Sequence, residues 1–387
     1  MVFSSSLFLV YFLPFFLLVY HFIDSKYKNW TILLASILFY SWGAPRFVFI
    51  LMASTIIDFY LVQQLHRATD EALRKRWLTL SIGMNVGLLL YFKYANFFVD
   101  NINGLLTRSG WVPLDWLGVA LPIGISFYTF QTLTYSIDVY RKVSPPLNRL
   151  SDYLLYIMSF PQMIAGPIVR FHSIARELVD RPDHLDDRLQ GFIRFSIGLA
   201  KKVLIANVLG EQADVLIDQD AADWTTTTAW LGLLAYTFQI YFDFSGYSDM
   251  AIGLGRMMGF RFPENFNHPY ISGSITEFWR RWHITLGEWM RDYLYIPLGG
   301  TRVGSKVRLY FNLCLVFLIS GLWHGAAWNF VIWGIYHGLF LIMDRLFLLN
   351  ALKKIGKIPA AMFTFFVVML GWVFFRIEEW QLAWQYL

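Results

Sequence analysis

The feature that most constrains the fold is a run of 35 residues, Leu309 to Met343, without a formally charged side chain. As one straight helix it would extend about 52 Å, whereas the hydrocarbon core of a membrane is ~30 Å thick. The run therefore predicts a helical hairpin or a broken helix. We expect the break at GAAWN, residues 325–329, directly after His324. Non-helical backbone at membrane depth must line a cavity or be buried in protein.

The rest of the chain is also too apolar for a soluble protein. Its 387 residues are 57% hydrophobic and 15% charged, against ~25% charged in soluble domains. We predict an all-α, polytopic integral membrane protein that forms a single domain over 1–387, with about eleven transmembrane or re-entrant helices. The apolar segments expected to form them are 7–23, 30–42, 47–65, 77–98, 119–137, 152–169, 190–208, 228–253, 309–325, 328–343 and 359–376.

The basic residues indicate an orientation in the membrane. They cluster in the loops after the first, third and fifth segments, at 26–28, 67–76 and 141–149. The positive-inside rule makes these loops cytoplasmic and the N-terminus extracytoplasmic, and the acidic segment 211–223 is expected outside. The first segment lacks a basic n-region and a cleavage site, so it predicts a retained span. Basic loops also explain the net charge of +5 without a nucleic-acid surface.

Residues 256–300 differ from the apolar segments, because they are too charged to cross lipid and too aromatic for a plain loop. They predict amphipathic helices in the cytoplasmic interface. Glu277 and Arg281 are i,i+4 partners on such a helix. Glu288 and Asp292 have the same spacing but like charge, so they need an arginine partner.

His324 is the leading candidate for chemistry, since an ionisable residue within a membrane segment is costly and commonly functional. Trp323, Gly321 and Gly325 flank it, and glycine permits close approach of backbone or substrate. The alternative is a neutral histidine hydrogen-bonded to a neighbouring helix. His337 would point about 220° away on a continuous helix, which favours a structural role.

Two further groups carry ionisable side chains among aromatic residues. His283 follows Arg280, Arg281 and Trp282 in WRRWH, which fits either an anion or acyl-donor site or an interfacial helix with snorkelling arginines. The residues alone favour the second interpretation.

Asp243 and Asp249 lie in an apolar segment. They could orient a catalytic group or form a proton path, but pairing with interfacial arginines as structural locks is favoured. The single cysteine, Cys314, excludes disulfides and thiol-ligated metal sites. His283 and His324 are too far apart in sequence to form a local ligand pair, and P-loop, GxSxG and HExxH motifs are missing, so we expect no metal and no bound cofactor.

An ordered set of motifs resembles one family over nearly the whole chain. It comprises MVFSS at the start, YFKYANFFVDNIN at 91–103, LPIGISFYTFQTLTYSIDVYR at 121–141, FPQMIAGPIVRF at 161–171, YFDFSGYSDMAIGLGRMMGFRFPENFNHPYIS at 241–272, SITEFWRRWHITLGEWMRDYLYIPLGG at 274–300 and GLWHGAAWNFVIWGIYHG at 321–338. The chain thereby resembles the membrane-bound O-acyltransferases, in the bacterial branch that contains the integral-membrane subunit of alginate O-acetyltransferase. Members of that branch usually continue well past residues 371–376, so a chain ending at Leu387 is expected to be a short or a truncated member.

The resemblance implies catalytic roles for His324, in GLWHG, and for His283, at a second signature position. It implies transfer of an acyl group, acetyl above all, from acetyl-CoA or another cytoplasmic thioester across the bacterial inner membrane. A secreted SGNH-type partner would place the group on alginate, cellulose, peptidoglycan or another polysaccharide. Residues expected to bind substrate are Trp323, Arg280, Arg281, Trp282, Asp243 and Arg291, with the arginines attracting the donor's phosphates.

Imidazole chemistry agrees with this implication. A desolvated, neutral histidine can take a proton from an attacking hydroxyl, and a closed site protects the thioester from water. Two other functions fit the composition. One is a transporter or flippase gated by His324 and Asp243, which inverted repeats would favour. The other is a non-catalytic scaffold for a secreted acetyltransferase.

Overall fold

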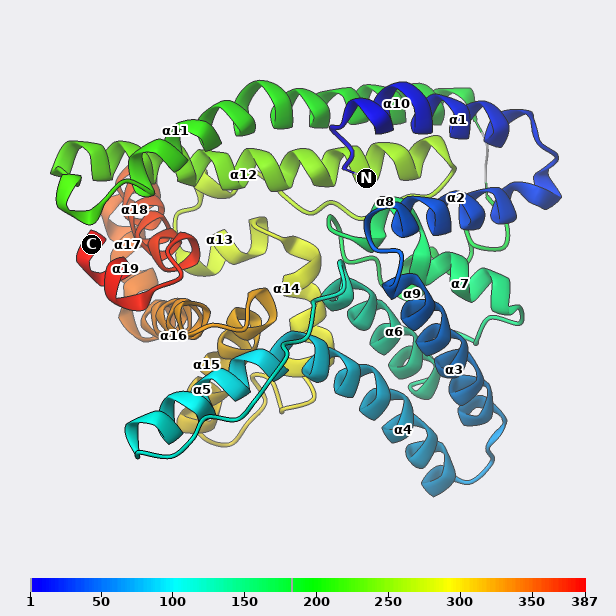
Figure 1. Ribbon diagram of the computed structural model, residues 1–387, viewed down its shortest axis with the longest axis horizontal. Helices are drawn as coiled ribbons and strands as arrows, with labels where there is room; N and C mark the ends of the chain where they lie inside the picture. Colours follow the sequence, from blue (N-terminus) through cyan, green and yellow to red (C-terminus); the bar gives the residue numbers. More distant parts are fainter. Residues whose placement is uncertain (1, 182–183) are drawn as a thin grey trace. The chain divides into compact units, whose positions relative to one another are not determined.

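The computed structural model describes residues 2–181 and 184–387, and all regular elements in them are helical (Figure 1). The all-α prediction is therefore confirmed for the described chain. The chain divides into two compact units. The first contains the residues up to Ser196 together with Asp249–Pro263, and the second contains Ile197–Ser248 and Glu264–Leu387.

The first unit consists mainly of the N-terminal helices. These are η1 (Leu7–Phe12), α1 (Leu13–Phe22), η2 (Ser25–Tyr27), α2 (Lys28–Gly43), α3 (Phe47–Arg67), α4 (Glu71–Leu89), η3 (Leu90–Tyr94), α5 (Ala95–Arg108), α6 (Ile125–Tyr140), α7 (Leu150–Met158), α8 (Phe160–Met163), α9 (Phe171–Ile174) and most of α10 (Leu185–Ala200).

The second unit carries the motifs that the sequence singles out. Its helices are η4 (Lys201–Ala206), α11 (Asn207–Ile217), η5 (Ala221–Asp223), most of α12 (Thr226–Met257), η6 (Pro269–Ile271), α13 (Ile275–Arg281), α14 (Ile284–Met290), η7 (Arg291–Tyr295), α15 (Lys306–His324), α16 (Trp328–Met343), η8 (Asp344–Leu348), α17 (Leu349–Ile355), α18 (Lys357–Arg376) and α19 (Trp380–Tyr386).

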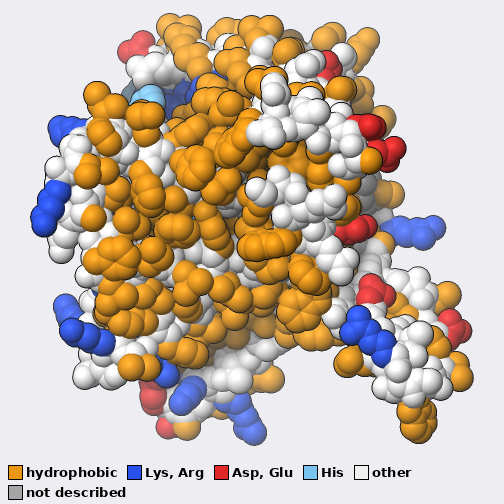
Figure 2. All heavy atoms as spheres, turned by 90° about the vertical axis from the view of Figure 1, so that its left-hand side faces the viewer, with side chains coloured by type: hydrophobic (Ala, Val, Ile, Leu, Met, Phe, Trp, Pro, Cys, Tyr) orange, Lys and Arg blue, Asp and Glu red, His pale blue; other side chains and the backbone are white. Residues whose placement is uncertain are grey.

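Among the described residues, five helices are long and apolar enough to cross a membrane. They are Phe47–Arg67, Glu71–Arg108, Lys306–His324, Trp328–Ile355 and Lys357–Arg376. Large apolar side chains on them are exposed, among them Leu339 and Met362, and Figure 2 shows apolar side chains over much of the face that it presents. Exposed apolar surface on this scale fits a lipid environment. The chain is therefore a multi-pass membrane protein, as predicted.

The number of spans stays a prediction, because some of the expected segments are not single long helices. The segment 152–169 is divided between α7 and α8 at Ser159, which has a non-helical backbone. The helix expected at 119–137 begins at Ile125. Apolar composition alone does not distinguish a buried short helix from a span.

The charge-free run forms the predicted hairpin. Helix α15 ends at His324, residues 325–327 are not helical, and α16 begins at Trp328. The two helices pack side by side (Figure 1). A Cβ atom on Gly334 would lie 2.5 Å from the carbonyl oxygen of Phe317, so this glycine is required for the close approach of the two backbones. The packing fixes the end of α15, where His324 lies.

A buried polar cluster holds the first unit together. The Asp58 carboxylate on α3 accepts hydrogen bonds from Ser81 (2.6 Å) and Asn85 (2.8 Å) on α4, and from Tyr153 on α7. Ser136 on α6 lies 2.7 Å from the Ser81 hydroxyl. Asp58 is fully buried, and these donors supply the hydrogen bonds that a buried carboxylate requires.

Candidate active site

His324 lies at the end of α15 because the backbone becomes extended at the next residue, Gly325 (φ −159°, ψ 152°). Its imidazole is surrounded by three aromatic rings. The centroid distances are 4.9 Å to Trp323, 5.2 Å to Trp333 and 5.1 Å to Phe375, and each pair meets edge to face. Rings in this arrangement restrict the orientation of the imidazole.

His283 lies between α13 and α14 and is 2% exposed. Its Nδ1 is 3.0 Å from Oδ1 of Asn265. The ring meets Phe244 edge to face at 4.7 Å and lies 5.9 Å from the indole ring of Trp323. Trp323 therefore contacts both His283 and His324.

The environment of His283 keeps its imidazole neutral. Burial, and secondly the charge of His324, lower the pKa of His283 well below its usual 6.5. Burial acts because the cation loses more hydration than the neutral ring does. The two imidazoles lie near one another, because both contact the indole ring of Trp323.

Helix α13 holds this region in place through its N-terminus. Ser274 accepts a hydrogen bond from the Glu277 amide (3.1 Å), and the Glu277 carboxylate accepts one from the Gly273 amide (2.9 Å). This arrangement resembles a capping box, except that the carboxylate accepts from the residue before the N-cap and not from the N-cap amide. Asp344, which follows α16, accepts hydrogen bonds of 2.8 Å from the amide and the hydroxyl of Thr276. The last contact ties α13 to the hairpin that carries His324.

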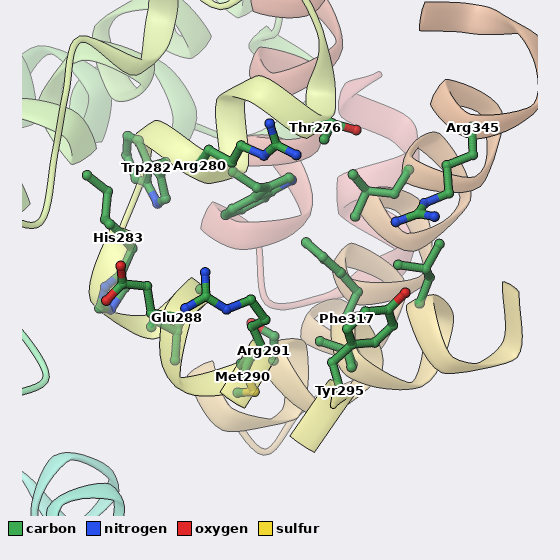
Figure 3. A pocket seen from close by; sticks show the side chains of 18 residues that line it. Thr276, Arg280, Trp282, His283, Glu288, Met290, Arg291, Tyr295, Phe317 and Arg345 are labelled. Carbon is green, nitrogen blue, oxygen red and sulfur yellow. The ribbon is translucent and has the colours of Figure 1, made fainter. Parts of the chain in front are cut away.

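A pocket of about 560 Å³ opens beside these helices (Figure 3). Its walls come from α13, α14, η7, α16, the start of η8 and one face of α15, which contributes Leu313, Phe317 and Ser320. His283 lines the pocket as well. His324 is not among the lining residues. Because residues four apart on a helix share a face, it lies one turn beyond Ser320 on the same face of α15.

Three arginines surround this pocket and come from separate elements. Arg280 extends from α13, Arg291 from η7 and Arg345 from η8 (Figure 3). Arg291 pairs with Asp292 at 2.7 Å, so the arginine partner that we expected for Asp292 is confirmed. Among the described residues, no carboxylate forms an ion pair with Arg280 or Arg345. These two guanidinium groups are available to an anionic ligand.

The pocket brings together four of the residues expected in the site: Arg280, Trp282, His283 and Arg291. Trp323 is buried between the two imidazoles. Arg281 does not line the pocket, because it pairs with Glu277 at 2.8 Å, as its i,i+4 spacing predicts.

Asp243 and Asp249 are also outside the pocket lining. Asp243 pairs with Lys202 at 2.7 Å, in the second unit, and Asp249 pairs with Arg194 at 2.6 Å, in the first. The expected arginine pairing therefore occurs at Asp249, whereas the partner of Asp243 is a lysine.

His337 is fully buried on α16 and lies among the rings of Trp279, Trp333 and Tyr336, at 4.9, 5.0 and 5.1 Å. Neither of its ring nitrogens has a hydrogen-bond partner among the described residues. Trp333 lies against both His337 and His324. These contacts fit the packing role that we expected for His337.

Two residues of the site were not identified from the sequence. Arg345 follows the charge-free run after a single residue, Asp344, and this place at the end of the run was the available signal. Asn265 lies in the quoted motif FPENFNHPY but had no assigned role. Its contact with His283 is tertiary, and no periodic pattern reveals it. Among the described residues, no group of three or more His, Cys, Asp or Glu side chains could hold a metal ion.

Comparison with known proteins gives a consistent result. The model of the membrane-bound O-acyltransferase family matches residues 124–378. The chain is 48% identical to the probable alginate O-acetylase of Azotobacter vinelandii over 100% of its own length and 77% of the relative's. The corresponding protein of Pseudomonas aeruginosa is 47% identical, over 100% and 74%. The peptidoglycan O-acetyltransferase of Helicobacter pylori is 38% identical, over 98% and 77%.

Proposed function

Because the chain belongs to the membrane-bound O-acyltransferase family, and is therefore a membrane O-acyltransferase, we propose that it moves acetyl groups from a cytoplasmic thioester toward an exported polysaccharide. Alginate is the favoured polymer, because relatives named for its acetylation are 47–48% identical across the chain. We further propose His324 and His283 as the catalytic residues. The observation that carries the proposal is that these two imidazoles contact the same indole ring, Trp323, beside a pocket with arginines around it.

The pocket suits a phosphorylated acyl thioester such as acetyl-CoA. Its volume of about 560 Å³ lies in the range of small-molecule sites. Guanidinium groups recognise phosphates through charge-assisted hydrogen bonds, and Arg280 and Arg345 would supply them. Apolar side chains such as Leu313 and Phe317 line the part along α15, where the pantetheine arm would lead toward His324.

The orientation of the hairpin supports a cytoplasmic donor. Helix α15 begins next to Arg302, Lys306 and Arg308, and Arg345 follows the end of α16. The positive-inside rule therefore assigns this end of the hairpin, and the arginines of the pocket, to the cytoplasm. We propose this orientation, with the N-terminus outside, together with a location in the inner membrane of a bacterium.

The proposed reaction is general-base acyl transfer at His324. The imidazole takes the proton of an acceptor hydroxyl while the hydroxyl oxygen attacks the thioester carbonyl carbon. The new C–O bond forms, the C–S bond breaks, and the thiolate leaves with the proton from the imidazolium. With the donor bound, the aromatic rings around His324 would limit the access of water that hydrolyses the thioester. The hydroxyl belongs to the polymer, or to a secreted esterase-like partner that passes the acetyl group to it.

The test is complementation of cells that lack this gene, with acetyl groups on the exported polymer as the readout. We expect His324→Ala to abolish acetylation at normal membrane levels and normal association with partners. His66→Ala is the matched control, because His66 is exposed at the end of α3. Full acetylation by His324→Ala would overturn the proposal and favour a scaffold or a transporter.

A further inference from the structure

We propose that Asn265 is a positioning residue that holds His283 as the Nδ1–H tautomer and so presents the Nε2 lone pair of His283 to the reaction site. This inference rests on the proposed function, because it defines the state of a histidine in the same site. Its evidence is the hydrogen-bond network around the buried side-chain amide of Asn265. This network determines which nitrogen of His283 carries the proton before any substrate binds.

The network first fixes the orientation of the Asn265 amide. Asn265 is fully buried, and its Nδ2 donates to the Ser248 hydroxyl at 3.0 Å. Its Oδ1 accepts from the hydroxyl of Thr285 at 2.9 Å and from the backbone amide of Thr285 at 3.4 Å. A backbone N–H can only donate, so the atom that faces it has to be the oxygen. With the amide reversed, its NH2 group would face the N–H of Thr285, and two donors would oppose each other.

The orientation of the amide then fixes the proton on His283. Nδ1 of His283 lies 3.0 Å from the same Oδ1. A carbonyl oxygen carries no hydrogen, so Nδ1 has to be the donor. A neutral imidazole has only one N–H, and its second nitrogen is therefore an acceptor. The lowered pKa of His283 keeps the ring in this neutral form at pH 7.

The backbone conformation of His283 is also held by the segment around Asn265. His283 has φ 45° and ψ 53°, a left-handed conformation that is strained for a residue with a Cβ. The Ile284 amide donates to the Asn265 carbonyl at 2.9 Å, and the Asn267 amide donates to the Arg281 carbonyl at 2.9 Å. These bonds hold the turn between α13 and α14 and so direct the ring of His283.

Nε2 is thereby left for a group outside the protein. It is buried and has no hydrogen-bond partner among the described residues, although a buried acceptor without one is costly. His283 lines the pocket and is close to His324. A hydrogen-donating group of the substrate at Nε2 would satisfy this acceptor.

The charged and titratable groups near His283 come from the helices around it. They are His324 on α15, Arg280 on α13, Glu288 on α14 and Arg291 on η7, whereas α12 contributes the uncharged ring of Phe244. None of them contacts the amide of Asn265 in the network described above. A change at Asn265 therefore acts on His283 first.

The first experiment measures the tautomer directly. The purified full chain, labelled with ¹⁵N-histidine, is examined by NMR, and the His283 signals are identified as those lost in His283→Asn. We expect a protonated Nδ1 and an unprotonated Nε2 at pH 7. A protonated Nε2 would overturn the proposal even if the enzyme is an acetyltransferase, so this readout is independent of the proposed function.

The second experiment compares Asn265→Asp with Asn265→Leu in membranes supplied with acetyl-CoA. The aspartate keeps the acceptor oxygen but adds a negative charge that favours the imidazolium. We expect the acid limb of its pH–activity profile to move up by about one unit or more, with activity recovered at high pH. The leucine removes the acceptor, and activity per folded protein should fall about 10- to 100-fold at all pH values, as for other groups that orient a reacting histidine.

Asn312→Asp is the matched control, because Asn312 is an equally buried amide that bonds only the Leu298 carbonyl in the second unit. It is expected to lower membrane levels without moving the pH profile. If both Asn265 variants behave like this control, with an unshifted profile, the role of Asn265 is structural and the proposal is wrong.

Discussion

The indole ring of Trp333 lies against the imidazole of His324, with centroids 5.2 Å apart and planes at 81°. Trp333 is fully buried and also contacts Phe375, at 5.6 Å. It belongs to α16, whereas His324 ends α15. The partner helix of the hairpin therefore contributes to the orientation of the proposed base.

We predict that Trp333→Ala lowers the turnover number for acetyl transfer at least tenfold, because His324 loses one of the three rings that orient it. The cavity should also cost about 3–5 kcal/mol of stability, so activity has to be expressed per folded protein. Trp384→Ala is the control, because Trp384 is exposed on α19. A normal turnover number for folded Trp333→Ala would show that this contact does not orient His324.

The hairpin itself was predictable from sequence. The charge-free run is too long for a single membrane crossing, and the break was expected at GAAWN, residues 325–329. The structure has the break there, although helix α16 already begins at Trp328. The environment of His324 was not predictable, because Phe375 is distant in sequence and reaches the ring only through the packing of α18. Periodicity identifies which face of a helix is buried, but not what that face contacts.

Asp58 was not singled out from the sequence, although it lies in a span. We predict that Asp58→Ala leaves the donors of Ser81, Asn85 and Tyr153 without their acceptor. Each unsatisfied buried donor costs about 1–3 kcal/mol, so the variant should be destabilised by at least about 3 kcal/mol. The measurement is the melting temperature in detergent, together with the amount of protein in membranes.

Asp58→Asn keeps one acceptor oxygen and should be affected less than Asp58→Ala. Asp100→Ala provides the exposed control on α5 of the same unit. Equal melting temperatures for Asp58→Ala and Asp100→Ala would contradict a structural role for the cluster.

His283 should make stability depend on pH. Its pKa is lowered in the folded protein by burial, and secondly by His324, whereas the unfolded chain has the usual value of about 6.5. Below pH 6.5 the unfolded state therefore binds more protons than the folded state, and stability falls by up to about 1.4 kcal/mol per pH unit. Above pH 6.5 this contribution is constant.

The measurement is the melting temperature between pH 5 and pH 7.5. We expect His283→Asn to flatten the decline on the acid side, whereas the exposed control His66→Asn should retain it. An unchanged slope in His283→Asn would mean that other groups produce the decline.

The arginines of the pocket provide the test of the donor. Arg345→Ala should raise KM for acetyl-CoA about 10- to 100-fold, the equivalent of one lost charge-assisted hydrogen bond of about 1.5–3 kcal/mol. Because the guanidinium group would contact the phosphates and not the thioester, the turnover number should change little. Arg280→Ala should behave in the same way, and added salt should raise KM less in either variant than in the wild type.

Arg302→Ala is the control, because Arg302 is an exposed cation at the same basic end of the hairpin and does not line the pocket. If Arg302→Ala raises KM as much as Arg345→Ala, the arginines act only through the overall positive potential of this surface. If only the turnover number falls in Arg345→Ala, the side chain supports the helices around His324 instead. A rise in KM without a change in the turnover number would place the phosphates of the donor between Arg280 and Arg345. The rest of the donor would then lie along α15, whose residues lead toward His324.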